Sequence, residues 1–237
     1  MTTRLIIARH GNTFTKDQTP TRVGCQTDLA LVEEERGTLL GRYIKEHNML
    51  PQVVWAAPLK RTMQTAELAV REMGLDIKII PDHSFVEIDY GPDENKTEDE
   101  VMLRLGKTYL AKAGKDVSQF SEEEIKARGK IVIDEWNADA TVPEGWIVDP
   151  AQIIKTWQNF AAKVEQDYVG QTALIVSSNG VLRFAPYLTG NFAEFSASHD
   201  IKVGTGNLCI FEKEAGDKNW KCMGWDIKPK DYFKNKI

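Results

Sequence analysis

Cysteine is scarce in this chain of 237 residues, which contains three: Cys25, Cys209 and Cys222. They are scattered and odd in number, and no two have the spacing of metal ligands. The sequence therefore predicts neither a disulfide framework nor a cysteine-ligated metal site. We expect reduced thiols, as in a cytoplasmic protein.

Long apolar runs and basic clusters are also missing. No apolar run approaches the roughly 20 residues that a transmembrane helix needs. The formal net charge is −5, and without a block of Lys and Arg both nucleic acid and anionic membranes are poor partners. A strand-like run begins within four residues of Met1, which leaves no room for a signal peptide. We therefore expect a cytoplasmic protein that binds neither nucleic acid nor membrane.

What the chain does contain is an alternation of strand and helix patterns, and its hydrophobic content of 42% can fill one sizeable core. The expected strands are Leu5–Ala8, Val53–Ala56, Ile77–Ile80, Thr172–Val176, Leu208–Glu212 and Trp220–Trp225. The expected helices are Glu33–His47, one from Pro58 to about Gly74, Ala151–Tyr168 and a last one that carries Arg183. This order predicts an α/β fold, a three-layer α/β/α sandwich with a mainly parallel, doubly wound sheet.

One highly charged segment interrupts the alternation. From Thr97 to about Asp139 the pattern is mostly helical, with Trp136 among the few apolar anchors. We interpret residues 1–237 as a single domain with a helical insertion at about 96–148. Two hypotheses remain for this insertion: a lid over a functional site, or a helical decoration without such a role.

The first strand leads into Arg9-His10-Gly11-Asn12-Thr13. An arginine and a histidine thus lie where a strand leaves the sheet, and ligands of open α/β folds bind beyond the carboxyl ends of the strands. A guanidinium matches the oxygens of a phosphoryl group in pairs. A histidine beside it can act as a nucleophile or a base.

Three further segments follow strand ends. They are Arg61-x-x-Gln64-Thr65-Ala66, the stretch Phe85-Val86-Glu87-Ile88-Asp89-Tyr90-Gly91, and Ser177-Ser178-Asn179-Gly180. With the first motif, they resemble the histidine phosphatase (phosphoglycerate mutase-like) superfamily from about Arg4 to about Phe211. The resemblance implies a phosphate pocket in which His10 is the nucleophile and Arg9 and Arg61 bind the phosphoryl oxygens.

The same resemblance implies that Glu87 protonates the leaving oxygen and that Asn12, Ser178 and Asn179 bind substrate. The carboxylates that compete with Glu87 for the role of the acid are Asp82, Asp89, Asp93 and Glu94. Phosphoryl transfer is catalysed mainly by positioning and electrostatic stabilisation. Two arginines can supply both without a metal, so we expect no metal site and no cofactor.

The chain departs from the family at the last segment, where a second histidine usually follows the central strand as Ser-His-Gly. Counting back from Arg183 puts Ser178 at that position, whereas matching the following glycine puts Asn179 there. Either residue can donate a hydrogen bond, but neither can carry a positive charge. No other histidine is placed by the sequence to substitute for it.

Three functions fit these observations. The first is a phosphomonoester hydrolase, slow or specialised, that works through a phosphohistidine. The second is a non-catalytic protein that binds phosphate esters in the same pocket. The third is a phosphomutase of the phosphoglycerate mutase type, which would have to protect its phosphoenzyme from water. The expected partner is a small phosphorylated substrate or phosphate. The sequence does not determine the oligomeric state, and a homodimer is one possibility.

Overall fold

The computed structural model describes residues 1–234, and within them six strands form one sheet in the order β3-β2-β4-β1-β5-β6. The strands are β1 (Thr2–Arg9), β2 (Val53–Ala56), β3 (Ile79–Pro81), β4 (Thr172–Ser177), β5 (Leu208–Glu214) and β6 (Lys221–Ile227). The pairs β1/β4, β2/β4 and β2/β3 are parallel, whereas β5 pairs antiparallel with both β1 and β6. The α/β class and the mainly parallel sheet are thus confirmed.

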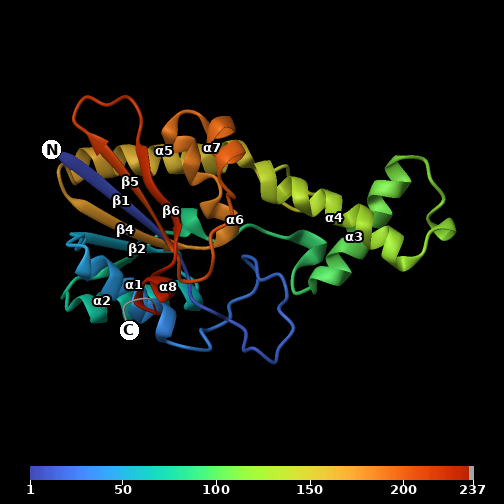
Figure 1. Cartoon of the computed structure of the whole chain (residues 1–237), viewed down its shortest axis with the longest axis horizontal. Coiled ribbons are helices and arrows are strands. Elements are labelled where there is room, and N and C mark those ends of the chain that lie inside the picture. The colour runs from blue at the N-terminus through green and yellow to red at the C-terminus, as the bar shows by residue number, and fades with distance from the viewer. Residues whose placement is uncertain (235–237) are drawn as a thin grey trace.

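Helices cover both faces of this sheet (Figure 1). The α-helices are α1 (Glu35–Glu46), α2 (Lys60–Met73), α3 (Glu98–Lys112), α4 (Glu122–Asp139), α5 (Pro150–Asp167), α6 (Asn179–Leu182), α7 (Phe192–Ser198) and α8 (Pro229–Lys234). Short 3₁₀ turns are η1 (His83–Phe85), η2 (Gly91–Asp93), η3 (Val117–Gln119) and η4 (Ala185–Thr189).

The alternation of side chains along the strands divides the core into two layers. On β1, Leu5 and Ile7 point to the layer that contains α5, α6 and α7, while Ile6 and Ala8 point to the layer with α1, α2 and α8. Successive strand residues face opposite sides of a sheet. The middle parts of the two central strands, residues 5–8 of β1 and 173–176 of β4, are therefore apolar without interruption, which is the pattern of a sheet buried on both faces.

The sheet register brings the ends of three strands to one edge. Arg9 pairs with Ser177, and Ala56 pairs with Val176, so β1, β4 and β2 end side by side. The His10 amide continues this alignment by donating to the Ser177 carbonyl at 3.1 Å. The chain segments that follow these strands therefore start close together.

Helices α3 and α4 form a pair that extends from the body, as Figure 1 shows. The loop of residues 10–34, which we call the first loop, lies at the same end of the molecule. Thr21 of this loop forms a β-bridge with Thr97, and Arg22 forms an ion pair with Glu98 of α3 at 2.7 Å. The insertion and the first loop thus contact each other directly.

Most predicted elements lie within one to three residues of the observed ones. The predicted helix that carries Arg183 is shorter: α6 ends at Leu182, and Pro186 lies in η4. Proline has no amide to donate, so an α-helix does not extend through this position without losing a hydrogen bond. The three cysteines are all free. Among residues 1–234 no helix is both long and apolar enough to cross a membrane.

Candidate active site

A cavity of about 910 Å³ opens at the shared edge where β1 and β4 end. Its wall combines the first loop, the start of α3, α4, and the turn after β4. Of the residues predicted for the site, five line this cavity: Arg9, His10, Asn12, Glu87 and Asn179. Arg61 and Ser178, also predicted, do not line it.

His10 is buried, with 6% of its surface exposed, and its ring has one fixed contact. Nδ1 lies 2.7 Å from the Gly11 carbonyl oxygen, which can only accept a hydrogen bond, so Nδ1 carries the proton. The Nε2 lone pair is then free for attack. Burial, and next the charges of Arg9 and Arg61, hold the pKa of His10 well below its ordinary value. The imidazole is therefore neutral at pH 7, as a nucleophile must be.

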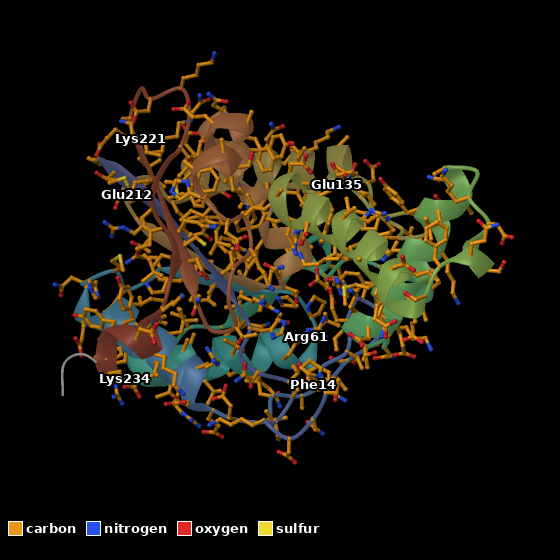
Figure 2. The ribbon with its side chains drawn as sticks, turned by 45° about the vertical axis from the view of Figure 1, so that its right-hand side comes forward. Phe14, Arg61, Glu135, Glu212, Lys221 and Lys234 are labelled. Atoms are coloured by element: carbon orange, nitrogen blue, oxygen red, sulfur yellow. The ribbon has the colours of Figure 1, made fainter. Side chains whose placement is uncertain are left out.

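Arg9 and Arg61 reach the site from different elements. Arg9, at the end of β1, lines the cavity and donates from Nη1 to the Val203 carbonyl at 2.7 Å. Arg61, in the first turn of α2, is fully buried and donates to the carbonyls of Thr27 and Gly24 at 2.7 and 3.1 Å. Figure 2 shows Arg61 at the end of the body that faces α3 and α4, with Phe14 of the first loop at the same end.

Burial lowers the pKa of both arginines, while the nearby Glu87 opposes that shift. Within the described chain neither guanidinium has a carboxylate at ion-pair distance, and each has a buried Nε–H without a partner. Arg61 thus adds positive charge behind His10 and supports the first loop. Its phosphate contact stays a prediction.

Glu87 is the acidic side chain that the sequence singled out, and it is buried in the cavity wall. Its carboxylate accepts the Gly180 amide at 3.1 Å and the Ile88 amide at 3.0 Å. A Cβ at Gly180 would lie 2.4 Å from the Glu87 Oε1, so this carboxylate requires a glycine there. The competing carboxylates Asp82, Asp89, Asp93 and Glu94 do not line the cavity.

Ser178 and Asn179, in the turn after β4, have different surroundings. The Ser178 hydroxyl is completely buried and has no hydrogen-bond partner. Asn179 lines the cavity, and its Oδ1 accepts the Val203 amide at 2.8 Å. Asn12, across the cavity, accepts the Thr205 hydroxyl at 2.6 Å. His199 lines a separate hollow and not this cavity.

The motif residues of α2 support the site from behind. The Thr65 hydroxyl accepts the Gly11 amide at 3.0 Å, and the Gln64 side chain accepts the Leu31 amide at 2.8 Å. These bonds fix the residue after His10 and the far end of the first loop. They explain why Gln64 and Thr65 occur beside Arg61 in a phosphate-binding pattern.

Arg22, Tyr90 and Arg183 are among the residues that line the cavity although the sequence did not assign them to the site. Arg22 lies over the rings of Tyr90 and Trp146, with its guanidinium carbon 5.5 and 4.9 Å from their centroids. No sequence pattern connects these residues, because they come from segments far apart in the chain. Among residues 1–234 no group of three or more histidine, cysteine or acidic side chains is arranged to hold a metal ion.

The family model of the histidine phosphatase superfamily (branch 1) matches residues 5–142, more than half of the chain. The chain belongs to this superfamily. The match includes His10, Arg61 and Glu87 but ends before β4, so the turn with Ser178 lies outside it. No curated protein sequence matches the chain.

Solved structures of phosphatases and mutases share the superfamily fold with this chain. A phosphoglycerate mutase from Bacillus anthracis str. Sterne is 17% identical, with a TM-score of 0.70, covering 100% of this chain and 97% of its own. The protein named mycobacterial hydrolase 1 is 16% identical, also with a TM-score of 0.70, at 96% and 100% coverage. A mycobacterial glucosyl-3-phosphoglycerate phosphatase is 18% identical, with a TM-score of 0.67 at 96% and 100% coverage. At these identities the similarity establishes the fold alone.

Proposed function

We propose that this protein is a phosphomonoester hydrolase that forms a phosphohistidine at His10 and needs no metal. The observation that carries the proposal is the state of the His10 ring. It is neutral, its Nδ1 is held by the Gly11 carbonyl, and it lies in a cavity beside the charge of Arg9. The membership of the chain in the histidine phosphatase superfamily supports the proposal.

In the first step, Nε2 of His10 attacks phosphorus, and the bond between phosphorus and the ester oxygen breaks. The leaving oxygen takes the proton of the Glu87 carboxyl, and the phosphoryl group stays on nitrogen. In the second step, a water attacks phosphorus while Glu87 takes its proton, the bond between phosphorus and Nε2 of His10 breaks, and inorganic phosphate leaves. Arg9 and Arg61 counter the charge on the phosphoryl oxygens in both steps.

A short incubation with a ³²P-labelled phosphomonoester tests this mechanism. A phosphoramidate survives alkali and is lost in acid, so label should remain on the His10 peptide after denaturation in base. His10→Ala should remove both label and turnover, while Glu87→Gln should slow labelling by alkyl phosphates far more than by an aryl phosphate. Label on Ser177 or Ser178 that survives acid would contradict the mechanism.

A second function is a phosphate-ester binding protein without turnover. It is favoured by one observation: the turn after β4 offers a buried serine and an asparagine where a cationic imidazole is usual. A protein of this kind would bind inorganic phosphate but show neither label nor hydrolysis in the same experiment. A mutase would show phosphoryl exchange without net release of phosphate.

A further inference from the structure

Arg183, directly after α6, lines the cavity and has only 2% of its surface exposed. Its Nη1 donates to the backbone carbonyl of Trp136, and its guanidinium carbon lies 3.9 Å from the centroid of the Trp136 ring. Its Nε–H is buried without a partner. The side chain is thus fixed at one end by α4 of the insertion, while part of its donor capacity is unused.

No carboxylate of the described chain lies within ion-pair distance of this guanidinium. Burial lowers the pKa of Arg183 to about 10, opposed by Tyr90 and Glu87 and reinforced by Arg22 and Arg9. The group is therefore still charged at pH 7, and it belongs to the same electrostatic cluster as Glu87 and Arg9. A buried cation without a counter-ion is costly, and an anionic ligand would remove that cost.

Arg183 also lies on the turn where the superfamily's second histidine is missing. It is four residues after Asn179, and residues four apart share one face of a helical turn. Asn179 and Arg183 both line the cavity, whereas the Ser178 hydroxyl does not. Between β4 and Arg183, this turn has no other charged side chain to present to a ligand.

We propose that Arg183 binds the oxygens of the phosphoryl group in place of the absent histidine, and that Trp136 positions it. This inference rests on the proposed function, since it needs a phosphoryl group at His10. A guanidinium can hold the Trp136 carbonyl with one nitrogen and still present donors to phosphate oxygens. The insertion would then be part of the phosphoryl site through α4.

The affinity for inorganic phosphate and for orthovanadate, measured by calorimetry, tests this proposal. Arg183→Met keeps the side-chain length but removes the charge, and we expect both dissociation constants to rise about 10- to 100-fold, the range of one hydrogen bond to a charged group. Arg128→Met is the matched control, because Arg128 is an exposed arginine of α4 that does not line the cavity. It should change either constant less than about threefold.

The double variant Asn179→His with Arg183→Met should recover most of the lost affinity, because position 179 lines the cavity and an imidazolium there would face the phosphoryl group. A merely structural role would not give this rescue. If the methionine variant does not fold, Arg183→Lys takes its place in the test. We expect it to weaken phosphate binding severalfold, since a lysine ammonium cannot donate the two parallel hydrogen bonds of a guanidinium. Near-ultraviolet circular dichroism confirms that each variant is folded.

Unchanged affinity of Arg183→Met for both anions would overturn the proposal while leaving the proposed function intact. A loss of affinity confined to phosphate esters that carry a second anionic group would also overturn the proposal, because it would place Arg183 at another part of the substrate. Failure of the unaltered protein to bind either anion would overturn both the role of Arg183 and the proposed function.

Discussion

At the scale of single residues, the proposed mechanism depends on keeping the His10 ring neutral, with its one proton on Nδ1 and with Nε2 free. An ordinary histidine would be partly protonated at pH 6.5 and could not attack phosphorus in that form. Here the pKa of His10 is lowered by burial and by two neighbouring arginines, and only its hydrogen bond to Gly11 opposes this. In the proposed mechanism, the two arginines that would bind phosphate also keep the His10 ring neutral.

A titration of the histidine rings by NMR tests this state. The His10 signal, identified by its absence from the spectrum of His10→Gln, should stay that of a neutral ring well below pH 6.5. Below that pH the unfolded chain takes up a proton at His10 that the folded chain does not, so the free energy of unfolding should fall as the pH falls. His10→Gln should lack this part of the decrease. A His10 signal that titrates near pH 6.5 would contradict the prediction.

Sequence reasoning was most accurate for residues whose role is set by their own strand. His10 and Arg9 follow an apolar strand that is buried on both faces, so their place at the edge of the sheet could be predicted. The surroundings of Arg61 were harder to predict, because its hydrogen-bond partners are backbone carbonyls of the first loop, which no pattern of side chains reveals. Arg183 could not be assigned at all, since its environment depends on Trp136, 47 residues earlier in the chain.

At the scale of elements, α3 and α4 form the helical part of the insertion, and α4 connects it to the site. The buried residues of α4, Ile125, Gly129, Ile133 and Trp136, recur at helical spacing and so form one face. This face packs on α3 at one end and reaches Arg183 at the other. The sequence predicted helices in this segment, but its high charge obscured the position of the break between α3 and α4.

Gly129 of α4 and Gly106 of α3 lie where the two helices approach each other closely. A Cβ at Gly129 would lie 1.8 Å from the Met102 carbonyl oxygen of α3, so Gly129→Ala must push the helices apart. We expect the free energy of unfolding, from urea titration, to fall by about 1–3 kcal/mol, as for other overpacked sites. Arg128→Ala, an exposed neighbour on α4, should change it by less than about 0.5 kcal/mol. Equal stability of both variants would show that α3 and α4 do not pack this closely.

At the scale of the whole molecule, charge is unevenly distributed. The chain carries a net charge of −5, yet the charged residues that line its cavity are Arg9, Lys16, Arg22, Arg183 and Lys202 against Glu87, Glu98 and Asp99. This excess of positive charge is what a doubly charged phosphate needs. On our proposal, it also takes the place of a metal as the source of positive charge, which is the basis of the last prediction.

Protein dialysed against a chelator, and then freed of it, should hydrolyse an aryl phosphate at its original rate. Added magnesium or zinc should not raise that rate. Inorganic phosphate at about 100 times its dissociation constant should still stabilise this protein by about 2.7 kcal/mol, a rise in Tm of roughly 5–10 °C. Because the proposed phosphate site uses arginines and no metal, chelation should change neither the rate of hydrolysis nor the stabilisation by phosphate. Loss of hydrolysis that magnesium or zinc restores would show that the guanidinium groups do not supply enough positive charge for the reaction.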